Sequence, residues 1–188
     1  MKRLSGVCQV LIIILSILAL SACPKKPVGG TQEYGAGYGS DQSGMGPGGM
    51  GLSESQWREL GLNTPAERQE FMQRAQTFEN EDIYFPYNGY TLTEEARRVL
   101  QQKAEFLKRY PKAKVTVEGH CDERGTTEYN LALGERRATT AYQYLKQSGI
   151  SVGNLTMISY GKERPLATGH DEASWAKNRR AHFALNLQ

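Results

Sequence analysis

The sequence predicts an α/β (α+β) sandwich, in which one sheet is backed by helices, preceded by a disordered tether. Beyond residue 81, short β-branched segments alternate with amphipathic helical patterns in the order β-α-β-α-β-(α)-β, which favours right-handed crossovers. Ahead of that region, 10 of the 20 glycines fall between Gly29 and Gly51, a composition that cannot form a core. A length of 188 residues suits one domain with additional segments.

The first 22 residues have the pattern of a secretory signal peptide. Lys2 and Arg3 give a positive start, and residues 10–20 form an apolar block that is too short for a membrane-spanning helix, which needs about 20 residues. The block leads into Leu-Ser-Ala-Cys, which ends at Cys23 and resembles the bacterial lipobox. We therefore expect residues 1–22 to be cleaved and Cys23 to carry acyl chains such as palmitate that anchor the protein. The alternative is an ordinary signal peptide with a chance cysteine.

Removal of the signal peptide changes the charge and the cysteine content of the chain. Lys2 and Arg3 leave, so 21 of the 23 basic residues remain against 20 acidic ones, a net charge of +1. This balance gives no basis for nucleic-acid binding. Cys8 leaves as well, Cys23 is acylated and Cys121 is then alone, so no intramolecular disulfide is expected.

Two unlike segments separate Cys23 from the predicted domain. Residues 23–51 are glycine-rich and contain no branched aliphatic residue after Val28, so we expect a flexible tether. Residues 52–80 form a helical lead-in segment. Pro65 suits the first turn of a helix, and the apolar residues that follow share one helical face, namely Phe71, Ala75 and Phe78.

The domain itself is expected to span residues 81–188. Thr93 can cap a helix whose first turn is acidic, and Gly149 fits the end of the longest helix. The expected strands cover residues 82–85, 114–120, 155–160 and 180–187, and the expected helices follow Thr93 or cover residues 128–147 and 172–177.

The chemistry of the domain concentrates in the loop and helix that follow the strand 114–120. Asn130, Leu133 and Arg137 share one helical face, and Asp122 precedes that helix. Arginine binds a carboxylate through two parallel hydrogen bonds, and aspartate accepts from an ammonium. The pair therefore suits a free amino-acid head group. The alternative is that Asp122 and Arg137 form a structural salt bridge with each other.

Residues from about 84 to 187 resemble the OmpA-like peptidoglycan-binding domain, and more closely the peptidoglycan-associated lipoproteins (Pal) of Gram-negative bacteria. The resemblance rests on the runs VTVEGHCDERGTTEYNLALGERRA, ISYGKERP and GHDEASWAKNRRA, together with the lipobox and tether. It implies that Asp122 and Arg137 hold the amino and carboxyl groups of diaminopimelate in the peptidoglycan stem peptide. Asn130 and Leu133 then support the site.

The resemblance also implies a location and partners. The protein would lie in the outer membrane, anchored through Cys23 and facing the periplasm, and would act with TolB and other Tol proteins in envelope integrity and cell division. Backbone N–H groups of Tyr87 and Asn88 would assist the ligand carboxylate. Pro86 departs from the family pattern at this loop and has no N–H to offer.

Catalytic, metal and cofactor sites are not expected. The three histidines form no paired-ligand motif, and His120 and Cys121 are adjacent, so on a strand they point to opposite faces. We expect Cys121 to be packed in the interior, with a free thiol that is chemically inert. Two alternatives to wall binding stay open, a peptidoglycan hydrolase or amidase and a protein adaptor.

Overall fold

The structure, a computed structural model, describes residues 51–187. The predicted signal peptide 1–22, the acylation site Cys23 and all but the end of the tether 23–51 lie outside the described residues. Among the residues it describes, no helix combines the length and the apolar character needed to cross a membrane.

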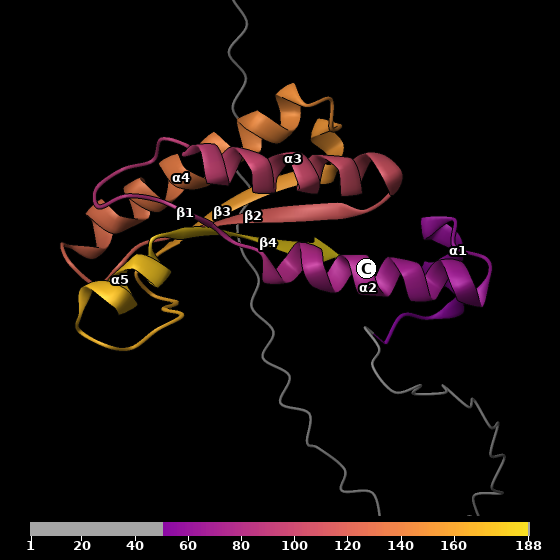
Figure 1. Cartoon of the computed structure of the whole chain (residues 1–188), viewed down its shortest axis with the longest axis horizontal. Helices are drawn as coiled ribbons and strands as arrows, with labels where there is room; N and C mark the ends of the chain where they lie inside the picture. The colour runs from indigo at the N-terminus through magenta and orange to yellow at the C-terminus, as the bar shows by residue number, and fades with distance from the viewer. Residues whose placement is uncertain (1–50, 188) are drawn as a thin grey trace, which may run out of the picture. The chain divides into compact units, whose positions relative to one another are not determined.

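The described chain folds into a mixed α/β domain whose elements follow the predicted order (Figure 1). A single four-stranded sheet contains β1, β4, β2 and β3 in that spatial order. The elements are α1 (Glu54–Leu60), α2 (Pro65–Asn80), β1 (Ile83–Tyr84), α3 (Glu94–Arg109), β2 (Lys114–His120), α4 (Thr127–Gln147), the 3₁₀ turn η1 (Val152–Asn154), β3 (Leu155–Gly161), α5 (Glu172–Asn178) and β4 (Arg180–Asn186).

The sheet is mixed because β4 lies between β1 and β2 and runs antiparallel to both of them. β2 and β3 are parallel, with α4 between them in the chain, whereas β4 runs antiparallel to both β1 and β2. Figure 1 shows α3 and α4 lying side by side across one face of the sheet. The predicted α/β (α+β) sandwich with a sheet backed by helices is thereby confirmed.

Threonine caps define the starts of the two helices that cover the sheet. The Thr93 side chain accepts a hydrogen bond from the N–H of Ala96 at 3.1 Å, and Thr126 accepts from the N–H of Tyr129 at 3.2 Å. Each cap satisfies one of the N–H groups that a helix N-terminus leaves without a partner. The predicted cap at Thr93 is confirmed.

The lead-in helices share the core of the sheet domain. Phe71 and Phe78 of α2 are buried and face Phe106 of α3, with ring centroids 5.8 and 4.7 Å apart. Phe78 also meets Phe183 of β4 in an edge-to-face arrangement at 6.3 Å. Aromatic pairs of this kind add to the stabilisation from buried area. Residues before 81 therefore contribute to the same hydrophobic core as the strands after it.

A contact between two glycines lets α4 lie directly on β2. A Cβ placed on Gly119 of β2 would lie 1.9 Å from the carbonyl oxygen of Gly134 of α4, so only hydrogen fits there. Gly134 in turn faces Ser159 of β3. This close approach sets the distance of α4 from the end of β2, where the candidate site lies.

Candidate ligand-binding site

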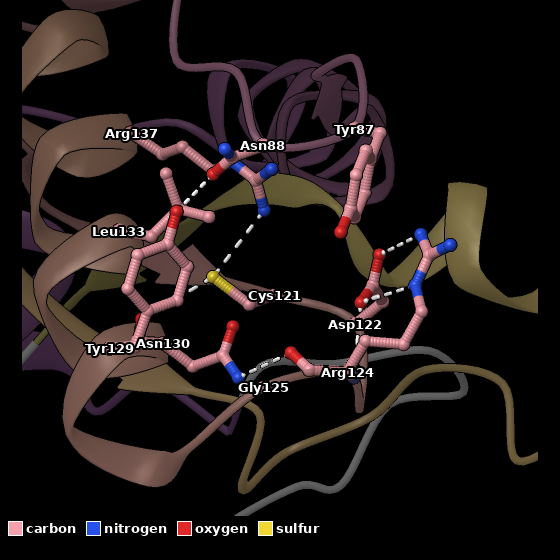
Figure 2. A pocket seen from close by; sticks show the side chains of 10 residues that line it. All are labelled: Tyr87, Asn88, Cys121, Asp122, Arg124, Gly125, Tyr129, Asn130, Leu133 and Arg137. Atoms are coloured by element: carbon pink, nitrogen blue, oxygen red, sulfur yellow. Dashed lines mark hydrogen bonds and ion pairs between the residues drawn. The ribbon is translucent and has the colours of Figure 1, made fainter.

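A pocket of about 130 Å³ opens where β2 ends, between the turn after β1 and the N-terminal half of α4 (Figure 2). All six residues predicted for the ligand site line it. They are Tyr87, Asn88, Asp122, Asn130, Leu133 and Arg137. The remaining lining residues are Cys121, Arg124, Gly125 and Tyr129.

Arg137 is the innermost polar residue of the pocket and is fully buried. Its Nε donates to the Gly89 carbonyl at 2.9 Å, its Nη1 to the His120 carbonyl at 2.7 Å and its Nη2 to the Pro86 carbonyl at 3.3 Å. One guanidinium thus joins α4 to the end of β2 and to the turn after β1. These bonds use three different nitrogens of the guanidinium, whereas a lysine would have only one nitrogen to offer.

The charge of Arg137 has no counter-ion within residues 51–187. Its remaining contacts are the Cys121 Sγ, 3.4 Å from Nη1, and the Phe85 ring, whose centroid lies 5.4 Å from the guanidinium carbon. Burial lowers the pKa of Arg137, yet a guanidinium stays protonated in proteins. A buried, unpaired charge is costly, so a carboxylate that enters the pocket gains a strong partner.

The hydrogen-bond count limits how a carboxylate could reach Arg137. Carbonyls and sulfur occupy the Nε–H, both Nη1–H groups and one Nη2–H group, which leaves one of the five N–H groups. The two parallel bonds expected from the sequence are therefore not both available in this state. Other donors have to complete the recognition of a carboxylate.

The turn after β1 offers such donors. It is closed by a hydrogen bond of 3.0 Å from the Gly89 N–H to the Pro86 carbonyl, and Asn88 adopts a left-handed φ of 55°. The Asn88 side chain accepts a hydrogen bond from the Tyr129 hydroxyl. Among the described residues, no group accepts from the N–H of Tyr87 or of Asn88. The turn therefore presents free N–H groups beside the pocket.

Asp122 stands at the other side of the pocket, and it does not pair with Arg137. Its carboxylate binds Arg124, with Nη2 to Oδ2 at 2.7 Å (Figure 2). It also binds Arg179, with Nη1 to Oδ2 at 3.4 Å. The alternative of a structural Asp122–Arg137 salt bridge is wrong for this structure. Burial would raise the pKa of Asp122, but the bonds from Arg124 and Arg179 outweigh it and lower that pKa. The carboxylate is ionised at neutral pH.

Asn130 and Leu133 shape the pocket from α4. The Asn130 side-chain amide donates to the Arg124 carbonyl at 2.9 Å and to the Thr126 carbonyl at 3.1 Å, which holds the loop that carries Asp122. Leu133 is buried and supplies an apolar wall. The helical spacing therefore identified one residue that supports the loop and one that packs.

Among the described residues that line the pocket, no nucleophilic side chain has a base oriented toward it. Cys121 is buried beside the Asn130 carbonyl, 3.3 Å from its sulfur, and burial raises the pKa of its thiol to about 11. Burial lowers the pKa of His120 to about 3, so its imidazole is neutral. Within residues 51–187, no group of His, Cys, Asp or Glu side chains is arranged to hold a metal ion.

Two polar residues of the pocket were not identified from the sequence. Arg124 lies two positions after Asp122 in the same loop, and that proximity was a usable signal for an ion pair. Tyr129 precedes Asn130 on α4 and reaches Asn88 of a turn 41 positions away in the chain. No helical periodicity predicts that contact, because it depends on how the turn packs against α4.

Comparison with known proteins places this arrangement among bacterial envelope proteins. The model of the OmpA family matches residues 84–179. A peptidoglycan-associated lipoprotein of Legionella pneumophila is 39% identical over 173 residues, which cover 92% of this chain and 91% of that protein. The protein of that name from Pseudomonas aeruginosa is 54% identical over 101 residues, or 54% of this chain, and the match covers 60% of that protein's length.

Solved structures agree with the family match. The crystal structure of the peptidoglycan-associated lipoprotein from Burkholderia pseudomallei superimposes with a TM-score of 0.55 at 42% identity, over 57% of this chain and 91% of that one. The C-terminal domain of Helicobacter pylori MotB gives a TM-score of 0.53 at 20% identity, over 56% of this chain and 84% of that one. The second likeness concerns the fold alone.

Proposed function

The chain belongs to the OmpA family and to its peptidoglycan-associated lipoproteins, and from that premise we propose that it binds peptidoglycan noncovalently through the diaminopimelate of the stem peptide. This noncovalent attachment would link the outer membrane to the cell wall. The protein acts in this proposal as a binding module and not as an enzyme.

The observation that carries the proposal is the buried, unpaired charge of Arg137 at the base of a pocket whose other side holds an ionised carboxylate. The free end of diaminopimelate carries an ammonium and a carboxylate on one carbon. Its ammonium suits Asp122. Its carboxylate suits the remaining Arg137 N–H together with the free N–H groups of Tyr87 and Asn88.

The volume of the pocket supports the same ligand class. About 130 Å³ accommodates an amino-acid head group but not a disaccharide unit of the glycan. Leu133 and Tyr129 line the same pocket and offer apolar surface against which the aliphatic chain of the ligand can pack. We therefore expect the stem peptide to enter end-on and the glycan to remain outside.

Attachment to the outer membrane rests on Cys23, which lies outside the described residues. We propose acylation at Cys23, a periplasmic domain, and TolB and other Tol proteins as partners in envelope integrity and division. Metabolic labelling with a fatty-acid analogue should tag the protein, and Cys23→Ser should abolish the label. Labelling that survives this change would overturn the assignment.

One experiment separates the three functional hypotheses. The mature chain, in detergent, is incubated with purified sacculi that contain diaminopimelate, and both the pellet and the soluble fragments are measured. Sedimentation with the sacculi and no released muropeptide is the expected result. Released fragments would indicate a hydrolase or amidase, and an absence of sedimentation would favour a protein adaptor.

A matched ligand tests the chemistry of recognition. Sacculi in which lysine replaces diaminopimelate retain the side-chain ammonium but lack the carboxylate beside it. If Arg137 and the turn recognise that carboxylate, retention on lysine-type sacculi should fall by an order of magnitude or more. Equal retention on both types would show that Arg137 has another role.

A further inference from the structure

The carboxylate of Asp122 has no acceptor site left for a ligand. Oδ1 accepts from the Arg124 backbone N–H at 3.2 Å and from its Nε at 3.1 Å. Oδ2 accepts from the Arg124 Nη2 at 2.7 Å and from the Arg179 Nη1 at 3.4 Å. A carboxylate offers about four lone-pair sites. An ammonium can therefore bind Asp122 only if one of these donors leaves.

Aromatic rings on both sides complete the surroundings of the Arg124 guanidinium. Its central carbon lies 4.3 Å from the ring centroid of Tyr87 and 4.1 Å from that of Trp175. Figure 2 shows the guanidinium held against Asp122 with Tyr87 beside it. A carboxylate flanked by two aromatic rings is a site for a cation. In this structure its occupant is the chain's own Arg124.

The walls of this cation site are held independently of Arg124. The Trp175 indole N–H donates to Glu123 at 2.8 Å, and His170 contacts the same carboxylate at 2.8 Å. Tyr87 belongs to the turn whose carbonyls Arg137 binds. The site can therefore keep its shape when its occupant changes.

The two donors to Asp122 differ in their freedom to leave. Arg179 is buried and is fixed by the Phe85 carbonyl at 3.2 Å and by Glu172 at 2.6 Å. The Arg124 side chain is 31% exposed and reaches Asp122 from a loop. Its Nη2 already lies 3.9 Å from Glu172, which offers a second place for the guanidinium. Arg124 is thus the donor that can move.

We propose that Arg124 is an internal counter-ion that the ligand's ammonium displaces, taking its place against Asp122 between Tyr87 and Trp175 while the guanidinium shifts toward Glu172. The inference rests on the proposed function and deepens it. Arg124 then acts as a selectivity residue, because a stem peptide without a free ammonium has nothing to exchange for the ion pair. It also keeps affinity moderate, since each binding event first breaks an existing pair.

A double-mutant cycle tests the exchange. A diaminopimelate-containing muropeptide is titrated against the wild-type chain, Arg124→Ala, Asp122→Asn and the double variant. Removing the competitor should tighten binding about tenfold in the wild-type background. It should give no gain in the Asp122→Asn background, where no full charge is released. Arg97→Ala, which removes one exposed arginine of α3, is the control for net charge.

Unchanged or weaker binding by Arg124→Ala would overturn the proposal, because it would mean that Arg124 stays in place or contacts the ligand. A gain of the same size in the Asp122→Asn background, or in Arg97→Ala, would overturn it as well. If the wild-type chain binds no muropeptide at all, the proposed function fails, and this inference with it. Binding without the gain refutes the inference alone.

A second measurement needs no substitution. Protons of the Arg124 side chain lie between two aromatic rings, so their NMR signals should be shifted upfield in the free protein. Saturation with the muropeptide should move them toward the values of an exposed arginine. The same muropeptide with its free amino group acetylated should leave them in place. Signals that stay shifted in the saturated complex would contradict displacement.

Discussion

Arg137 and Lys103 are the two most deeply buried cations of residues 51–187, and their surroundings differ in kind. The Lys103 ammonium lies between the rings of Phe78 and Phe183, 4.4 and 4.5 Å from their centroids, and donates to the Phe78 carbonyl. It fastens α3 to α2 within the core. The Arg137 guanidinium instead holds carbonyls at the base of an open pocket.

The difference shows how burial acts on two kinds of cation. Burial lowers the pKa of Lys103 to about 8, although Asp82, Glu81 and Glu79 oppose the shift, so this side chain can lose its charge in mildly alkaline solution. A guanidinium has no such route. Its buried charge persists until a counter-ion arrives, and Arg137 lies where a ligand can supply one. Lys103 is therefore suited to stabilising the core, and Arg137 is suited to binding a ligand of opposite charge.

The largest expected effect comes from substituting each of the two residues separately. Only substitutions of Arg137 should weaken ligand binding. Arg137→Ala removes the charge that a ligand carboxylate needs, and muropeptide affinity should fall at least thirtyfold, about 2–5 kcal/mol. Arg137→Lys should also bind poorly, because a single ammonium nitrogen cannot replace the three nitrogens of the planar guanidinium. Lys103→Met should bind as the wild-type chain does. Calorimetric titration of variants checked for folding provides the measurement.

Loss of affinity in Lys103→Met equal to that in Arg137→Ala would remove the distinction between the two sites. So would wild-type affinity in a folded Arg137→Ala variant, which would make Arg137 purely structural.

The pH dependence of stability should distinguish Lys103 next. Its pKa is about 8 in the fold and 10.5 for an unperturbed lysine, so between these pH values the unfolded chain binds more protons. The free energy of unfolding should therefore rise with pH across that window, by about 3 kcal/mol relative to Lys103→Met. Below pH 8 both states are protonated, and the contribution should be flat.

Urea unfolding at pH 7.5 and pH 10 measures this difference. Comparison with Lys103→Met cancels groups that both chains share, such as Cys121, whose raised pKa acts in the opposite direction over part of this range. Parallel pH profiles for the two chains would show that Lys103 keeps its proton in the fold.

The smallest effect compares the caps of the helices that carry the two cations. Thr93 caps α3, which holds Lys103, and Thr126 caps α4, which holds Arg137. Each change to alanine should cost about 1 kcal/mol of stability, visible as a lower urea midpoint. Only Thr126→Ala should also weaken muropeptide binding, because loss of the cap loosens the backbone at Thr126, whose carbonyl holds Asn130 at the pocket. Equal binding by both variants would show that the pocket tolerates a loosened helix end.

Much of the fold could be predicted from local patterns. The helix expected over 128–147 is observed at Thr127–Gln147, and the strand expected over 114–120 at Lys114–His120. Turn residues, caps and hydrophobic periodicity act over a few positions and can be read directly. The strand order β1-β4-β2-β3 was not predicted, because it depends on which long-range pairings bury most surface.

In the site, too, residues with a local sequence pattern could be predicted and long-range contacts could not. Asn130, Leu133 and Arg137 were found because their helical spacing places them on one face, and Asp122 because it precedes that helix. The pairing of Asp122 with Arg124 had a local signal, because the two lie two positions apart, whereas the contact of the Arg124 guanidinium with Trp175, 51 positions later in the chain, had none. The burial of Lys103 could have been predicted from its position in the sequence. It stands three positions after Leu100 and four before Leu107, within the apolar stripe of α3.

The position of α1 relative to the pocket has a mechanical consequence. Gln56 of α1 donates to the Leu187 carbonyl just after β4, and Lys114 at the start of β2 lies beside it, whereas the pocket opens at the far end of β2. A force applied between α1 and a ligand bound at Arg137 would act along the direction of β2 and β4. Their ladder, from Lys114↔Asn186 to Gly119↔Ala181, would then be loaded in shear, so several hydrogen bonds would have to break together. Resistance to such a force depends on the rate of unfolding under load, which equilibrium stability does not determine.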